Sequence, residues 1–163
     1  MKKFIYLVTA LIMSITYTKS FAHCEIPCGI YDDEMRVHML QEHILTIEKS
    51  MKKINELSTK AKDPQTYNQL VRWIMNKEKH AKKFQHIVWR YFLTQRVKPV
   101  SPENHKEYEI YLKKLELLHK LSFYAMKAKQ TVDLKYIDIL RKTLLEFEEV
   151  YFGKKHIEEH HKH

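Results

Sequence analysis

The sequence predicts an all-α protein: an antiparallel four-helix bundle that follows a cleaved signal peptide and a short N-terminal metal-binding hook. Three observations support this prediction. Among 163 residues only two are glycines, and good helix formers such as Leu, Lys, Glu and Met are abundant. Apolar residues recur at steps of three and four in four separate segments. Both cysteines, Cys24 and Cys28, lie together just after an apolar N-terminal stretch.

Residues 1–22 have the pattern of a secretory signal peptide. Two lysines begin it, an apolar run extends from Phe4 to Ile15, and Ser20-Phe21-Ala22 ends it with small residues. A retained membrane anchor is the alternative, but the apolar core is shorter than the roughly 20 residues that span a bilayer. We therefore expect cleavage after Ala22 and an exported chain, periplasmic or extracellular, with no membrane association after cleavage.

The mature chain is expected to be basic. Of the chain's 29 basic residues three lie in the signal peptide, which leaves 26 against 20 acidic residues and a net charge of +6. The lysines are scattered, and an exported protein rarely meets nucleic acid, so we expect no nucleic-acid partner. A mild positive field would attract a small anionic substrate, and general solubility is the alternative explanation.

The first two helices are predicted over residues 33–59 and from Pro64 to about residue 93. Asp32 or Asp33 is placed to cap the first, and Asp63 to cap the second. The first apolar stripe consists of Val37, Leu40, Ile44, Ile47, Met51 and Ile54. The second consists of Tyr67, Leu70, Ile74, Lys77, Ala81, Phe84, Val88 and Tyr91. Lys77 is unexpected in such a stripe, because a buried ammonium without a partner is costly.

The third and fourth helices complete the predicted bundle, which spans residues 32–153. A connection from Thr94 leads to Ser101-Pro102, where a cap and a first-turn proline begin the third helix. Its stripe consists of Tyr108, Tyr111, Leu115, Leu118, Ser122 and Ala125. After a turn at Val132-Asp133, the fourth stripe consists of Ile137, Leu140, Leu144, Phe147 and Tyr151, and Gly153 ends the helix. Four amphipathic helices with short links pack most simply as an antiparallel bundle. Several aromatic residues suit either a subunit interface or the core, and the core is expected for each: Trp73, Tyr111, Phe123 and Tyr124.

The segment from His23 to Tyr31 is the predicted metal-binding hook, and it carries the chemistry. Its two thiols are open to three other readings: a disulfide, a structural zinc site, or a thiol–disulfide exchange centre. A ring this small constrains little of the unfolded chain, structural zinc normally needs a second Cys or His pair, and exchange centres use C-x-x-C on a βαβ scaffold.

The spacing favours a flat metal site instead. The α-amine of His23, the backbone nitrogen of Cys24 and the thiolates of Cys24 and Cys28 are placed to surround one ion in a plane, with the His23 imidazole as an axial ligand. Square-planar nitrogen and sulfur ligation suits nickel(II) or copper(II). Pro27 and Gly29 supply the tight bend that this arrangement needs.

The pattern His-Cys-x-x-Pro-Cys-Gly-x-Tyr, followed by an all-helical domain, resembles the nickel-containing superoxide dismutases from His23 to about Phe152. The resemblance implies one nickel ion per subunit with His23, Cys24 and Cys28 as ligands. It also implies conversion of superoxide anion to dioxygen and hydrogen peroxide by Ni(II)/Ni(III) cycling, and assembly as a homohexamer. Tyr31 is expected to stand over the open face of the metal and to order water and small anions. Tyr91 is expected to join it, and the alternative is that Tyr91 is a plain core residue.

The chain also departs from the family pattern. Glu25 stands where aspartate is more common, and the glutamate and arginine that hold the axial imidazole in better-known members fall near His38 and at Lys77. We therefore expect Lys77 to act beside His23. Residues 154–163 form a His-rich tail, either a nickel-gathering segment or a solvated end. The alternative function is an exported nickel or copper carrier without turnover.

Overall fold

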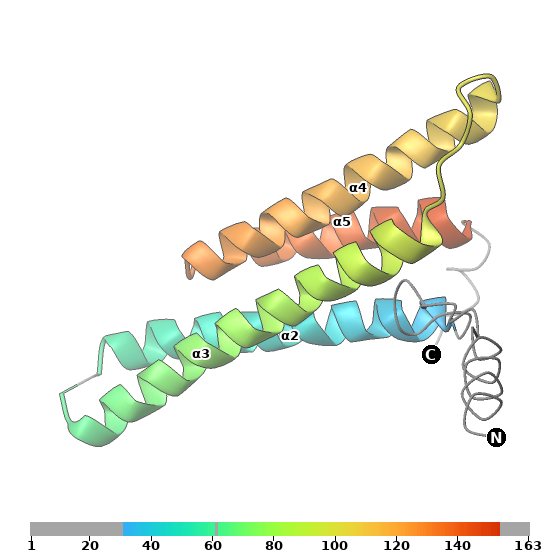
Figure 1. The fold of residues 1–163 in the computed structure, drawn as a ribbon. Coiled ribbons are helices and arrows are strands. Elements are labelled where there is room, and N and C mark those ends of the chain that lie inside the picture. Colours follow the sequence, from blue (N-terminus) through green and yellow to red (C-terminus); the bar gives the residue numbers. More distant parts are fainter. Residues whose placement is uncertain (1–30, 61, 154–163) are drawn as a thin grey trace, which may run out of the picture. The chain divides into compact units, whose positions relative to one another are not determined.

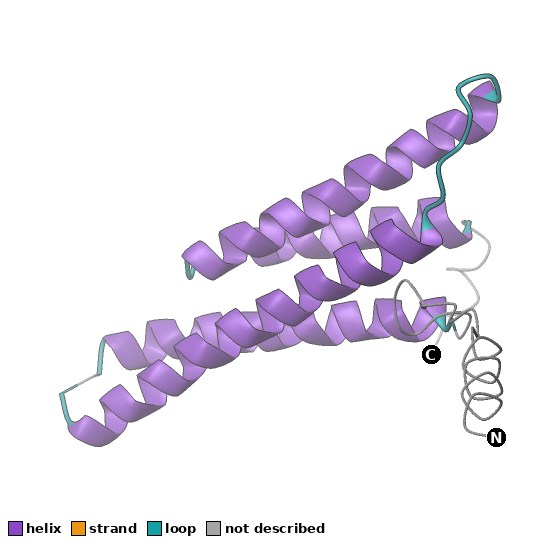
Figure 2. Ribbon diagram, in the orientation of Figure 1, coloured by secondary structure: helices purple, strands orange, loops and turns teal. Residues whose placement is uncertain are grey.

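The computed structural model describes residues 31–60 and 62–153. These residues form the helices α2 (Asp33–Ser58), α3 (Pro64–His86), α4 (His105–Gln130) and α5 (Lys135–Phe152), together with the π-helix η1 (Ile87–Arg96) (Figure 1). Within the described ranges there is no strand (Figure 2). The predicted all-α bundle is confirmed, whereas the predicted signal peptide, the hook before Tyr31 and the tail lie outside the described residues.

The bundle is built from two helical hairpins. α2 packs along α3 and α4 packs along α5, and further contacts join α3 to α4 and α2 to α5 (Figure 1). The first turn of α2, the end of η1 and the last turn of α5 come together at one end of the bundle, where Asp33 contacts Arg96 and Tyr151. Among the described helices, none combines the length and apolarity needed to cross a bilayer.

The core follows the predicted apolar stripes. All six stripe residues of α2 are buried, as are those of α5 up to Phe147. At the centre, the ring of Phe92 lies edge-on to Phe147 and Tyr151, with centroids 5.1 and 5.5 Å apart. Each fully buried side chain of this size contributes about 1.5–3 kcal/mol to stability, so these layers hold the bundle together.

The first half of α3 departs from the prediction. Tyr67 and Ile74, two members of the predicted stripe, are 54% and 40% exposed. α4 ends beside Lys77, whose Nζ contacts the carbonyl oxygen of Lys129, so the residues of α3 before Lys77 extend past the second hairpin (Figure 1). α2, the hairpin partner of α3, cannot by itself cover the whole stripe. Phe123, also expected in the core, is 42% exposed.

Local capping signals place most helix ends correctly. Asp32 Oδ1 accepts from the backbone N–H of Met35 at 2.9 Å, and Asp63 Oδ1 accepts from Thr66 at 3.0 Å. Gly153 ends α5 with a φ of 93°, a left-handed conformation that favours glycine.

The predicted start of the third helix at Ser101-Pro102 is wrong. The carbonyl of Ser101 accepts from the backbone N–H of Asn104 at 3.1 Å and closes a separate turn. α4 therefore begins later, at His105, with Asn104 as its N-cap residue.

The second helix also continues further than predicted, in a different geometry. Instead of ending before Thr94, the chain runs through η1 to Arg96 with bonds between residues five apart, as in Val97 N to Phe92 O at 2.8 Å. The Thr94 hydroxyl likewise donates to the carbonyl of Trp89. In an α-helix, residues five apart point about 140° away from each other. The wider π turn brings such residues closer to one face.

Candidate functional site

The Asp33 carboxylate, in the first turn of α2, accepts four hydrogen bonds from three side chains. Arg96 donates twice, from Nε to Oδ1 and from Nη2 to Oδ2, both at 2.7 Å. The hydroxyls of Tyr91 and Tyr151 donate to Oδ1 and Oδ2 at 2.7 and 2.8 Å. We call Asp33, Tyr91, Arg96 and Tyr151 the Asp33 cluster. It joins the start of α2 to η1 and to the end of α5.

The Asp33 cluster fixes the protonation state of its members. Burial alone would raise the pKa of Asp33, but the hydrogen bonds from Arg96, Tyr91 and Tyr151 together outweigh it and hold that pKa below its usual range. Burial, and next the hydrogen bond to the Asp33 carboxylate, raise the pKa of Tyr91 to about 12 and also raise that of Tyr151. At neutral pH, Asp33 is therefore ionised and both phenols are neutral.

These protonation states decide how Tyr91 can act. A neutral phenol has one hydrogen, and an ionised carboxylate can only accept, so the Tyr91 hydrogen lies on the bond to Asp33. A smaller contribution from the backbone of Asp32 opposes part of this rise in the pKa of Tyr91. Toward any further partner, the Tyr91 oxygen is an acceptor and not a donor.

Tyr91 is thus partly a core residue and partly a polar one. It is 4% exposed, its ring lies edge-on to Phe92 at 5.1 Å, and the guanidinium of Arg36 lies 5.0 Å from its ring centroid. Tyr31 is 40% exposed. No contact between Tyr31 and Tyr91 is described, so their expected pairing stays a prediction.

The predicted metal ligands His23, Cys24 and Cys28 lie outside the described residues. Their donor set of amine, imidazole, amide nitrogen and two thiolates suits nickel, because soft sulfur with nitrogen favours such ions in flat sites. Within residues 31–60 and 62–153, no three His, Cys, Asp or Glu side chains are grouped so as to hold a metal. Asp33 follows Tyr31 by two residues, so the Asp33 cluster holds the point where this segment joins the bundle.

Lys77 has partners that the sequence does not reveal. Its side chain is buried, and its Nζ donates to the carbonyl oxygens of Lys129 and Thr131, both at 2.7 Å. Carbonyls at a helix C-terminus lack partners within the helix, so the ammonium caps α4. Burial lowers the pKa of Lys77, with an opposing contribution from Glu78. Lys77 and Tyr91 are 14 positions apart on one helix, about 20 Å along its axis.

The structure thus does not bring Lys77 and Tyr91 together within the chain. The expected contact of Lys77 with His23 stays a prediction, because His23 lies outside the described residues. His38, the other position matched to the family's imidazole contacts, is exposed on α2.

A second titratable pair, His43 and His80, joins α2 to α3. Their Nδ1 atoms lie 3.2 Å apart and their rings meet edge-on, so one Nδ1 carries a hydrogen and the other accepts it. His43 is 7% exposed, and its Nε2 has no hydrogen-bond partner among the described residues. Burial, and then the positive charges of His80 and Lys83, lower the pKa of His43 to about 4.

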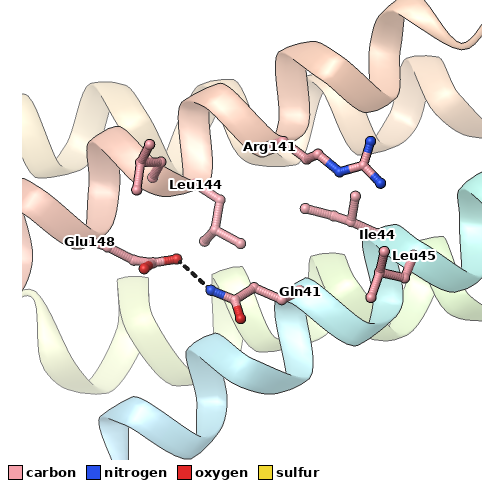
Figure 3. Close-up of a pocket in the computed structure, with 7 residues that line it drawn as sticks. Gln41, Ile44, Leu45, Arg141, Leu144 and Glu148 are labelled. Carbon is pink, nitrogen blue, oxygen red and sulfur yellow. Dashed lines mark hydrogen bonds between the residues drawn. The ribbon is translucent and has the colours of Figure 1, made fainter. Parts of the chain in front are cut away.

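The pocket between α2 and α5 offers few groups that could bind or react with a polar ligand. It encloses about 250 Å³, and Ile44, Leu45 and Leu144 project into it (Figure 3). Gln41 donates to Glu148 at 3.0 Å at one end (Figure 3). Arg141 pairs with Glu48. Its walls are mainly apolar and its charged groups are paired.

Sequence reasoning missed Asp33, Arg96 and Tyr151 as one site. Asp33 stood only as a possible cap, Arg96 fell in an expected connection, and Tyr151 was a stripe residue. The available signal was the charge of Asp33 beside a cap that Asp32 already supplies. No periodicity in the sequence links these three positions.

Comparison with known proteins gives one finding. The family model of the nickel-containing superoxide dismutases matches residues 18–155, which include the Cys24–Cys28 motif and the whole described bundle. No curated protein and no solved structure matches the chain. Since the match covers most of the sequence, the chain belongs to the nickel-containing superoxide dismutase family.

Proposed function

We propose that this superoxide dismutase works at a nickel ion held by its processed N-terminus. Two superoxide anions and two protons yield one dioxygen and one hydrogen peroxide. The observation that carries the proposal is the family match, which joins the cysteine motif and the bundle in one continuous region. His23, through its amine and imidazole, Cys24, through its amide nitrogen and thiolate, and Cys28 would hold the ion.

When bound, nickel would supply the one-electron chemistry by alternating between Ni(II) and Ni(III), which thiolate and amide donors make accessible. The protein's own part is to bind and orient superoxide and to deliver the protons that hydrogen peroxide requires. The Tyr91 oxygen, whose hydrogen is engaged by Asp33, would accept a hydrogen bond from a water molecule. That water would in turn donate to the anionic substrate, so Tyr91 would act on superoxide through water and not directly.

Two further features belong to the proposal. Cleavage after Ala22 would free the amine of His23, and it would place the protein outside the inner membrane. Assembly as a homohexamer would cover exposed apolar surface, of which α3 offers one face formed by Tyr67, Val71, Ile74 and Met75.

The test begins with the protein purified after signal cleavage. Its N-terminal mass, its nickel content per chain and its rate of superoxide removal are measured. We expect an N-terminus at His23, one nickel per chain and rapid turnover. Cys28→Ser and a form that retains Ala22 should lose nickel and turnover, whereas the control Glu25→Gln, outside the ligand set, should keep both.

The same measurements separate the alternative function. Stoichiometric nickel or copper without superoxide-dependent turnover would identify a carrier. Full turnover in the form that retains Ala22 would show that the free amine of His23 is not a ligand.

A further inference from the structure

The Asp33 carboxylate has no capacity for another partner. An ionised carboxylate offers about four acceptor positions on its two oxygens. Arg96, Tyr91 and Tyr151 supply four donors at 2.7–2.8 Å, two on each oxygen. The paired donation from Arg96 also fixes the plane of the carboxylate, since a guanidinium holds it in fork geometry. Asp33 is therefore held in one orientation.

The π-helix makes this arrangement possible. Tyr91 and Arg96 are five residues apart and both reach Asp33 Oδ1, at 2.7 Å each. In a continuous α-helix their side chains would diverge by about 140°. The i to i+5 turn of η1, seen in the bond from Val97 to Phe92, brings them to one side.

The Asp33 cluster also controls the chain just before α2. The Tyr91 hydroxyl donates to Asp33, the first residue of α2. Asp32 in turn caps the helix through Met35. The path of the chain from Asp32 into α2 is therefore fixed by side chains of η1 and α5.

We propose that Asp33 is a positioning residue for superoxide turnover: it fixes the point from which the nickel-binding segment leaves the bundle, and it orients the Tyr91 hydroxyl as an acceptor. This inference rests on the proposed function, in which that segment holds the metal. Arg96 and Tyr151 act through Asp33, because they hold its carboxylate in place. Asp33 itself need not touch substrate or metal.

The decisive variant is Asp33→Asn, with Asp32→Asn as its matched control. Asparagine offers one acceptor oxygen and an NH₂ donor, so it cannot accept four hydrogen bonds and turns hydrogens toward its former donors. Asparagine caps a helix as well as aspartate does, so Asp32→Asn should behave as the wild type. Nickel(II) affinity, turnover and the alkaline titration of tyrosine absorbance are measured for each, with Tyr91→Phe to assign the Tyr91 contribution.

For Asp33→Asn we expect nickel affinity to fall about tenfold and turnover about 10- to 100-fold, as for a misplaced reacting group. We also expect the titration of Tyr91 to move from about 12 toward 10. A folded Asp33→Asn protein that matches Asp32→Asn within about twofold in affinity and turnover, with an unmoved tyrosine titration, would overturn the proposal.

If Asp33→Asn does not fold, a second variant tests the same proposal. Tyr151→Phe keeps the ring in the core and removes one donor from Oδ2. It should fold and lower turnover a few-fold, and unchanged turnover together with an unchanged tyrosine titration would then reject the proposal. A wild-type protein that binds no nickel would instead reject the proposed function, while the tyrosine titration would still report whether Asp33 holds Tyr91.

Discussion

Acid should destabilise the bundle through His43, and one substitution isolates the effect. The folded protein holds His43 neutral, because burial and the nearby charges of His80 and Lys83 lower its pKa from 6.5 to about 4. Unfolding restores the ordinary pKa, so the unfolded chain binds the extra proton first. The stability that the folded state owes to a neutral His43 is therefore fully present above pH 6.5, and it is lost as the pH falls from 6.5 toward 4.

The size of the effect follows from the shift. A difference of about 2.5 pKa units corresponds to about 3 kcal/mol once the pH is below both values. Between pH 7 and pH 4.5, where most but not all of it is expressed, linkage gives about 2 kcal/mol from this one side chain. The carboxylates with lowered pKa values, such as Asp33 and Glu48, add to the total loss in every variant that retains them.

Urea unfolding of the wild type and His43→Leu at both pH values measures the difference directly. At pH 7 the two should agree within about 1 kcal/mol, because leucine forfeits one hydrogen bond but removes the buried Nε2 that lacks a partner. At pH 4.5 the wild type should have lost about 2 kcal/mol more than His43→Leu. His86→Gln, an exposed control on α3, should follow the wild type. Equal acid losses in the wild type and His43→Leu would refute the reasoning.

Three further outcomes are expected. Lys77→Met should lower the free energy of unfolding by about 2 kcal/mol, because two carbonyls at the end of α4 lose a charged donor. Unchanged nickel spectra and turnover in the folded variant would show that Lys77 serves α4 and not His23. Val71→Glu, on the exposed face of α3, should reduce the mass found by light scattering, whereas an unchanged mass would place the subunit contact elsewhere. Removing nickel with a chelator should abolish turnover but leave the helical circular dichroism, since apolar layers form the core; a parallel loss of helix signal would contradict this.

The bundle was predictable because its determinants are local. Apolar residues at steps of three and four define which face of α2 and α5 is buried, and Asp32, Asp63 and Gly153 mark helix ends by hydrogen bonds or conformations within a few residues. The same reasoning fails where a neighbour ends early. Ile74 continues the stripe of α3, yet it is exposed because α4 does not extend past Lys77.

The Asp33 cluster was not predictable, because its parts are far apart in sequence. Tyr91, Arg96 and Tyr151 lie 58, 63 and 118 positions from Asp33. Tyr91 and Arg96 share a face only in the i to i+5 geometry of η1, and α-helical spacing places them on different faces. Lys77 shows the converse: the sequence marks a lysine that needs a partner, but backbone carbonyls leave no residue-type signal by which to name one.

The composition of the Asp33 cluster indicates what it contributes. A partly buried ion pair loses much of its Coulomb energy to desolvation, so replacing such a pair with apolar residues is often neutral for stability. Asp33 and Arg96 keep 16% and 27% of their side-chain surfaces exposed, and that exposure weakens their attraction further. Apolar side chains would cover this end of the bundle equally well, but they would leave the first turn of α2 and the Tyr91 hydroxyl free to adopt several orientations. Directional bonds remove that freedom, and they do so two residues after Tyr31. The principal contribution of the cluster is therefore geometric: it defines how the chain enters the bundle and which way one phenol points.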